Sequence, residues 1–166
     1  MSSAGGGKTL VAYFSCTGNT KSAASYIAGA VGGDLYEITP QKPYSASDLD
    51  YSDKNSRSTS EQNDPSVRPA TAGKTVNMEG YSTVFVGYPI WWGQAPRIIN
   101  TFLESYDFTG KKMIPFCTSG ATDISGSIAG IKKSCSAKAV WLDGKRFSGG
   151  AAQSEVAGWA KSLGIK

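Results

Sequence analysis

The sequence predicts a single α/β domain in which a parallel β-sheet lies between two layers of helices. Short apolar runs with the composition of buried strands recur along the chain, and segments with apolar residues at helical spacing separate them. A strand that is apolar throughout is typical of a parallel sheet covered on both faces. The chain has 166 residues, which is the length of one domain. We expect a flexible tail at residues 1–7 and the domain at residues 8–166.

The first strand and the loop after it form the most informative stretch. Residues 9–14 are rich in valine, leucine and aromatic side chains, which indicates a buried strand. Gly18 lets the following loop bend without a Cβ clash, and a helix beginning near Thr20 would direct its free N–H groups toward that loop. An ordinary turn with a helix cap explains the same residues equally well. The phosphate-binding interpretation assigns Ser15, Cys16, Thr17, Gly18, Asn19 and Thr20 to a phosphate loop.

A helix and an edge strand are expected next. Small and apolar residues recur at helical spacing after Thr20, and Gly32 supplies a C-terminal stop. Residues 35–39 alternate between apolar and polar and end at Pro40, which fits a strand at the edge of the sheet. The apolar face of the helix contains Ala23, Ala24, Ile27, Ala28 and Val31.

The regular pattern is lost in a polar, insertion-like segment at residues 41–79. This segment is rich in serine, aspartate, asparagine and proline. A loop of that length without secondary structure is unusual in a compact domain. We therefore expect one or two short helical turns around residues 47–62, in the place of a crossover helix.

The next buried strand, at residues 80–88, leads into a loop with two adjacent tryptophans. The loop contains Pro89, Ile90, Trp91, Trp92 and Gly93. Two large aromatic side chains in one turn cannot both belong to an ordinary core, because each needs a packing surface and a partner for its N–H group. The helix that follows is predicted with Pro96 at its first position and an apolar face made of Ile98, Ile99, Phe102, Leu103 and Tyr106.

The C-terminal third is predicted to add two strands and two helices. Residues 112–117 and 137–142 have the composition of buried strands. A loop at residues 118–123 leads into one helix, and a turn-rich connection at residues 143–150 leads into the last. The apolar positions are Ile124, Ile128 and Ile131 in the first of these helices, and Val156, Trp159, Ala160 and Leu163 in the second.

Three loops of the chain resemble those of the flavodoxin family. They carry the motif SxTGNT from Ser15, YPIWWG from Tyr88, and TSG from Thr118. The resemblance implies a doubly wound, five-stranded parallel sheet of order 2-1-3-4-5 in a three-layer α/β/α fold. It also implies that FMN binds at the carboxyl ends of the strands, where the strand order reverses.

The resemblance further implies roles for the three loops. The loop from Ser15 to Thr20 would hold the phosphate, and residues 89–93 would border the isoalloxazine ring. Either Trp91 or Trp92 would stack on that ring, and the sequence leaves the choice open. The third loop would supply Thr118, Ser119, Gly120 and Asp123, of which the last three approach the pyrimidine edge or the ribityl chain.

The expected function is that of an FMN-binding electron carrier. Such a protein cycles FMN between redox states and exchanges electrons with a reductase and an acceptor protein, which the sequence does not identify. One alternative is an FMN-dependent NAD(P)H oxidoreductase that acts on quinones or similar small electrophiles. A second is a domain that binds a phosphate ligand without redox chemistry. Lys145 and Arg146 follow the fifth predicted strand and are expected on the ligand side of the sheet.

The composition argues against several other classes. The chain has 17 basic and 13 acidic residues, a net charge of +4, and its lysines are scattered rather than arranged in a basic stripe. Nucleic acid is therefore not an expected partner. The absence of histidine excludes a Ser-His-Asp triad and histidine-ligated metals. The three cysteines lack metal-site spacing, so neither a metal nor a catalytic residue is predicted.

Two further expectations concern Cys16 and the location of the protein. The thiol of Cys16 would have a lowered pKa if it lay beside a helix N-terminus, although backbone contact with the ligand is the more usual role at such a position. We recognise no signal peptide or transmembrane segment in the sequence. We therefore expect a cytoplasmic location, with export or lipoprotein anchoring as the alternative if a signal preceded Met1.

Overall fold

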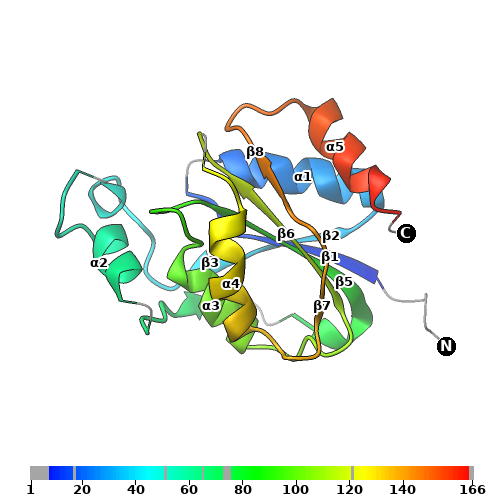
Figure 1. Cartoon of the computed structure of the whole chain (residues 1–166), viewed down its shortest axis with the longest axis horizontal. Coiled ribbons are helices and arrows are strands. Elements are labelled where there is room, and N and C mark those ends of the chain that lie inside the picture. Colours follow the sequence, from blue (N-terminus) through cyan, green and yellow to red (C-terminus); the bar gives the residue numbers. More distant parts are fainter. Residues whose placement is uncertain are drawn as a thin grey trace.

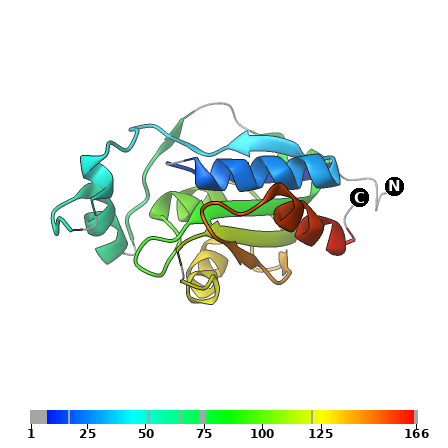
Figure 2. The same cartoon turned by 90° about the horizontal axis from the view of Figure 1, so that it is seen from above.

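Helices cover both faces of a parallel sheet in the computed structural model (Figures 1 and 2). The structure describes residues 8–16, 18–50, 52–64, 66–72, 76–120 and 122–164. The sheet has the order β2-β1-β5-β6-β7, and β8 also pairs with β6. These strands are β1 (Lys8–Tyr13), β2 (Asp34–Glu37), β5 (Tyr81–Pro89), β6 (Lys112–Thr118), β7 (Val140–Trp141) and β8 (Lys145–Phe147). In the numbering of the five predicted strands the order is 2-1-3-4-5, so the predicted fold class is confirmed.

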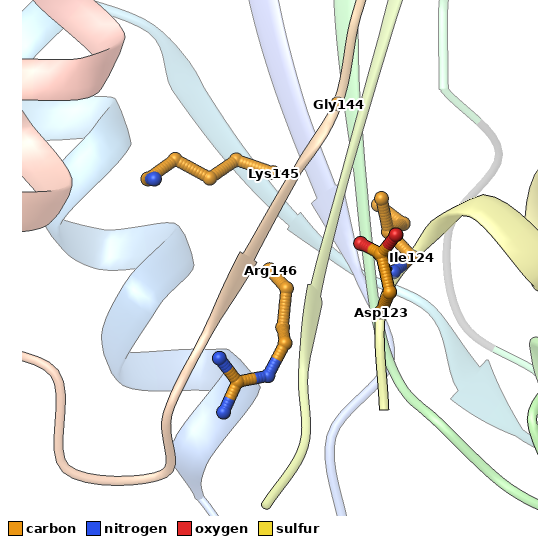
Figure 3. A pocket seen from close by; sticks show the side chains of 5 residues that line it. All are labelled: Asp123, Ile124, Gly144, Lys145 and Arg146. Atoms are coloured by element: carbon orange, nitrogen blue, oxygen red, sulfur yellow. Dashed lines mark hydrogen bonds between the residues drawn. The ribbon is translucent and has the colours of Figure 1, made fainter. Parts of the chain in front are cut away.

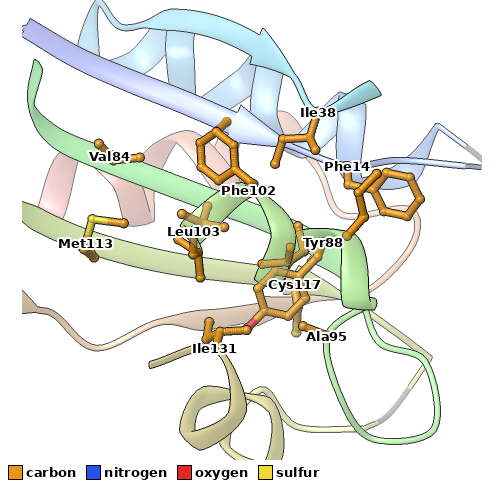
Figure 4. Packing of buried hydrophobic residues seen from close by; sticks show 14 of the residues in the cluster. Phe14, Ile38, Val84, Tyr88, Ala95, Phe102, Leu103, Met113, Cys117 and Ile131 are labelled. Atoms are coloured by element: carbon orange, nitrogen blue, oxygen red, sulfur yellow. The ribbon is translucent and has the colours of Figure 1, made fainter. Parts of the chain in front are cut away.

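The central strands separate two apolar cores. Successive side chains of a strand point to opposite faces, so Val84 of β5 faces one core and Phe85 faces the other. Helices α3 (Arg97–Glu104) and α4 (Ser125–Ser134) cover the first core, part of which is drawn in Figure 4. Helices α1 (Asn19–Val31) and α5 (Gln153–Ser162) cover the second. Both cores are apolar, which explains why the central strands are apolar throughout.

The outer strand next to β6 is divided in two: β7 occupies only residues 140–141 of the predicted strand 137–142, and β8 follows it. The carbonyl of Met113 on β6 accepts a hydrogen bond from the N–H of Leu142, directly after β7. The backbone groups of Pro115, two residues further along β6, point to the same edge of β6. Proline has no N–H to donate, and a Cβ at Gly144 would lie 2.5 Å from the Pro115 carbonyl oxygen. Pairing is interrupted there and resumes in β8. The prediction of a turn-rich connection throughout residues 143–150 was therefore wrong for β8.

The polar segment at residues 41–79 contains the expected short helices. They are the 3₁₀ turn η2 (Ser47–Leu49) and the helix α2 (Arg57–Asn63); a further 3₁₀ turn that was not predicted, η3 (Met78–Gly80), precedes β5. The short strands β3 (Thr39–Pro40) and β4 (Thr71–Ala72) pair in antiparallel fashion and close the segment. Helix α2 lies beyond the carboxyl ends of the strands (Figure 1) rather than over a sheet face, where a crossover helix was expected.

None of the helices that the structure describes has the length and apolar composition of a membrane span.

Gly87 of β5 leaves room for the ring of Phe116, its partner on β6. A Cβ at this position would lie 2.1 Å from the ring of Phe116, which is fully buried. We expect Gly87→Ala to lower the free energy of unfolding by ~1–3 kcal/mol through overpacking. The matched control is Gly29→Ala in α1, where a Cβ meets nothing within 4 Å. This change should raise stability by ~0.5–1 kcal/mol. Urea unfolding measures the change in free energy of unfolding for each variant, and equal changes in the two variants would contradict the prediction.

Candidate functional site

Four segments meet in a pocket of about 370 Å³ at the carboxyl edge of the sheet. They are the loops after β1, β5 and β6 and the connection between β8 and α5. This edge is where ligands of open α/β sheets bind, and the strand order reverses here between β1 and β5. The lining residues are Asn19, Pro89, Ile90, Thr118, Ser119, Gly120, Thr122 and Gly149.

The first loop brings the N-terminus of α1 to this edge. Gly18 has a φ of 96°, and its N–H donates to the hydroxyl of Ser15 at 3.1 Å. The first helical hydrogen bond runs from Ser22 N to Gly18 O, so the N–H groups of the three residues between them point out of the helix end. Together with the helix dipole they favour an anion. Thr17 lies outside the described residues.

A pair of buried hydroxyls joins the first loop to the third. The hydroxyl oxygens of Thr20 and Thr118 are 2.8 Å apart, and both residues are almost fully buried. The two groups carry two hydrogens, and their mutual bond uses only one of them. The other hydrogen points elsewhere and can be donated to a ligand oxygen.

The two tryptophans occupy different environments. Trp91 is buried, and its ring makes edge contacts with Phe14 at 5.7 Å and Tyr44 at 5.3 Å between centroids. Trp92 is 43% exposed. The prediction that the pair cannot both be ordinary core is confirmed.

The turn at residues 91–94 holds Trp92 in a conformation that is unusual for its residue type. Trp91 and Gln94 exchange two backbone hydrogen bonds, of 2.8 and 3.0 Å. The φ angles of Trp92 and Gly93 are 52° and 76°, the pattern of a type I′ turn. Trp92 is the only residue other than glycine with a positive φ among those that the structure describes. Such a conformation costs on the order of 1 kcal/mol and often marks a functional position.

Arg146 holds the third loop in place. Its guanidinium donates to the Ser119 hydroxyl at 3.0 Å and to the carbonyls of Ser119 and Gly120 at 3.2 and 2.8 Å. Arg146 therefore lies on the ligand side of the sheet, as expected, although within β8. The side chain of Lys145 leaves β8 on the side opposite to that of Arg146 (Figure 3), and its ammonium lies 5.8 Å from the Phe147 ring centroid.

Asp123 lies apart from the pocket. Its carboxylate accepts from the N–H of Ile124 at 2.7 Å and from the hydroxyl of Ser125 at 3.0 Å, both at the start of α4. It lines a neighbouring depression with Gly144, Lys145 and Arg146 (Figure 3).

Six of the predicted site residues line one pocket, and the others do not line it or lie outside the described residues. Asn19, Pro89, Ile90, Thr118, Ser119 and Gly120 line the pocket. Sequence reasoning gave no role to Gly149, where a Cβ would lie 2.9 Å from the Asn19 amide nitrogen. The sequence holds no local signal for this close approach, because the two residues are 130 positions apart. Ser15, Cys16, Gly18, Thr20, Trp91, Trp92, Gly93 and Asp123 are not among the lining residues of this pocket.

The polar segment contributes a charged cluster beside the first loop. The Arg57 guanidinium lies 3.7 Å from the centroid of the Tyr44 ring and donates to the Glu61 carboxylate at 2.9 Å. The hydroxyl of Tyr44 donates to the same carboxylate. Desolvation raises the pKa of the Cys16 thiol to about 11, against an opposing effect of the Arg57 charge. The expected lowering of this pKa was therefore wrong.

The raised pKa of Cys16 predicts slow alkylation. A group with a pKa of about 11 is protonated at neutral pH, and about one thiolate in a thousand is present at pH 8. The iodoacetamide rate at Cys16, followed by mass spectrometry, should rise about tenfold per pH unit from pH 7 to 10. Arg57→Gln should slow it, because the lost positive charge raises the pKa further. If the alkylation rate instead reached a plateau near pH 8.5, as expected for the urea-unfolded protein, the raised pKa of Cys16 would be contradicted.

The sequence profile of the flavodoxin family matches residues 8–163. A candidate flavoprotein from Bacteroides uniformis has a similar solved structure: 49% identity, a TM-score of 0.88, and coverage of 94% of this chain and 99% of that one. A candidate flavoprotein from Bacteroides eggerthii is 45% identical, with a TM-score of 0.87 and coverage of 96% and 99%. The FMN complex of a Lactobacillus acidophilus flavoprotein is 22% identical, with a TM-score of 0.68 and coverage of 93% and 99%. No match was found among curated protein sequences. The match of the family profile over nearly the whole domain shows that the chain belongs to the flavodoxin family.

Proposed function

We propose that the protein binds FMN at the carboxyl edge of its sheet and serves as an electron carrier. The observation that carries the proposal is that the start of α1, the end of β5 with Ile90, and the TSG loop line one pocket at this edge. A similar fold in the Lactobacillus acidophilus flavoprotein was solved with FMN bound, which supports the same cofactor here. A reductase and an acceptor protein would complete the electron-transfer chain.

The first loop has the chemistry of a phosphate site. The N–H groups at the start of α1 and one hydrogen of the Thr20 and Thr118 hydroxyls are available to a dianion. Asn19 lies at the same end of the helix and lines the pocket. The first turn of α1 contains no acidic residue, so no carboxylate competes for these donors. Ser15, Cys16, Thr17 and Gly18 would enclose the phosphate from the loop side.

The second and third loops have the chemistry of a site for a flat, polar ring. Pro89 and Ile90 give the pocket apolar surface, while Ser119 and Gly120 give it polar backbone groups. We assign the stacking role to Trp92, because Trp91 is committed to the core by its contacts with Phe14 and Tyr44. Gly93 would allow the turn that presents Trp92, and Asp123 would act by fixing the start of α4.

The pocket favours electron transfer over chemistry on a bound substrate. When FMN is bound, it supplies the redox chemistry, and the protein supplies binding, orientation and exclusion of water. Of the eight described residues that line the pocket, none has a side chain that titrates near neutral pH. A reductase acting on quinones must also deliver protons, and a positioned acid usually does so. The lining residues therefore support a carrier more than the oxidoreductase alternative.

The function is tested with the purified protein. We expect a yellow preparation, or one that becomes yellow on reconstitution with FMN, with a Kd below 1 μM as expected for a tightly held cofactor. The bound flavin should exchange electrons with a flavodoxin reductase but should give no steady turnover with NADPH and a quinone. Absence of FMN binding after reconstitution would refute the proposal. Rapid turnover with a quinone would favour the oxidoreductase.

Replacement of Thr20 tests the phosphate site. We expect Thr20→Ala to weaken FMN about tenfold, the equivalent of ~1.4 kcal/mol for a charge-assisted hydrogen bond, and to leave riboflavin affinity almost unchanged. Thr20→Ser keeps the hydroxyl and should bind FMN like the wild type. The control is Ser25→Ala, one turn further along α1, where the hydroxyl donates to the Lys21 carbonyl. Equal losses for FMN and riboflavin would exclude a phosphate contact by Thr20.

The two tryptophans should respond differently to truncation. Trp92→Ala should restore much of the fluorescence of bound flavin, because it removes the ring assigned to stacking, and it should cost less stability than the change at Trp91, because the Trp92 ring is 43% exposed. Trp91→Ala should lower the free energy of unfolding by ~3–5 kcal/mol, because it removes a large buried ring. Fluorescence titration with FMN and urea unfolding measure these effects. If Trp92→Ala leaves flavin fluorescence quenched, Trp92 does not stack on the ring.

A further inference from the structure

The C-terminal end of α2 holds the turn at residues 91–94 from the side. The side-chain nitrogen of Gln62 donates to the carbonyls of Trp91, at 2.9 Å, and Ala95, at 3.3 Å. Both partners can only accept, which fixes the orientation of the amide with its nitrogen toward the turn. The carbonyl of Trp91 also accepts the turn's own hydrogen bond from Gln94. Gln62 therefore binds both ends of the two-residue hairpin that carries Trp92.

A second link to α2 runs through Arg97, the first residue of α3. Its buried guanidinium donates to the carbonyls of Glu61 and Gln62, at 3.1 and 2.8 Å. These carbonyls belong to the last turn of α2, where the Glu61 carbonyl also accepts from the N–H of Asp64 at 3.2 Å. The same guanidinium donates to the Gln94 side chain at 3.3 Å. Arg97 thus ties the turn and the end of α2 to the start of α3.

The amide oxygen of Gln62 has no hydrogen-bond partner among the described residues, although the side chain is only 8% exposed. An unpaired buried carbonyl destabilises the folded state, and an apolar side chain of similar size would avoid this cost. What glutamine offers at this position is its two N–H donors, and both point at the turn.

We propose that Gln62 is a positioning residue that fixes the conformation of Trp92 before FMN binds. The proposal rests on the FMN site proposed above. Trp92 needs such support because its positive φ is disfavoured for a residue with a Cβ atom. The support extends to the rest of the polar segment, because α2 has only seven residues and depends on tertiary contacts such as those of Arg57 with Tyr44. The segment at residues 41–79 thereby becomes part of the flavin site without lining the pocket.

A double-mutant cycle tests whether Gln62 acts through Trp92. Gln62→Met keeps the side-chain volume and removes both donors. We expect it to raise the Kd for FMN about tenfold, as it would if only about a tenth of the molecules kept the competent turn. In the Trp92→Ala background the same change should alter the Kd by less than about twofold. A tenfold loss in both backgrounds would overturn the proposal.

The matched control is Ser58→Ala, one turn earlier on α2. Its hydroxyl is equally buried and also has no partner among the described residues, but it makes no hydrogen bond to the turn. The Kd for FMN should remain within about twofold of the wild type. If Gln62→Met is not folded at 25 °C, Gln62→Asn serves instead, because its amide is one methylene too short to reach both carbonyls.

A measurement without flavin separates this inference from the proposed function. In ¹⁵N-labelled protein free of FMN, the indole N–H resonance of Trp92 should be single and sharp in the wild type and in Ser58→Ala. It should be broadened or doubled in Gln62→Met. An unchanged resonance in Gln62→Met would overturn the role of Gln62. If the wild type fails to bind FMN while Gln62→Met still disorders Trp92, the function is refuted and the support of the turn by Gln62 is upheld.

Discussion

Strand β5 is hydrogen-bonded along its length to β1 on one side and β6 on the other, and the pocket depends on this double pairing. The register aligns the ends of the three strands, so that their loops begin at the same level of the sheet. The N–H of Phe14 donates to the Gly87 carbonyl and that of Ile90 donates to the Thr118 carbonyl, which extends the pairing to the pocket itself. The ring of Phe116 occupies the space that a Cβ of residue 87 would need, so this pairing requires a glycine there. A change in this register would separate the loop after β1 from the loop after β5.

The parts of the fold that follow a local pattern were predictable from the sequence. Buried strands carry continuous apolar runs, and the helix after the first loop ends at Gly32, which adopts a left-handed conformation with a φ of 68°. The three loops of the pocket were identified because their residue types are chemically distinctive. The number of strands then followed from alternation with helices, and their order from the resemblance to the flavodoxin family.

The parts that the sequence did not predict depend on contacts between distant residues. The division of the fifth strand results from Pro115, which lies 29 positions before Gly144. The position of α2 depends on hydrogen bonds from Arg97 to carbonyls in the last turn of the helix. The spacing of apolar residues in the sequence gives no indication of these bonds. The burial of Trp91 depends in part on the ring of Tyr44, which packs against it from the polar segment. Local propensity does not predict the strand break, the position of α2 or the burial of Trp91, because these features depend on tertiary packing.

The interruption of the outer strand has a consequence for association between molecules. An uninterrupted strand at the edge of a sheet offers a row of unpaired N–H and carbonyl groups, on which another chain can add a strand. Here that edge consists of two pieces of two and three residues, and the second carries the charges of Lys145 and Arg146. The opposite edge is also short and begins and ends with Asp34 and Glu37. The break that brings Arg146 to the TSG loop therefore also makes the sheet a poor template for edge-to-edge aggregation.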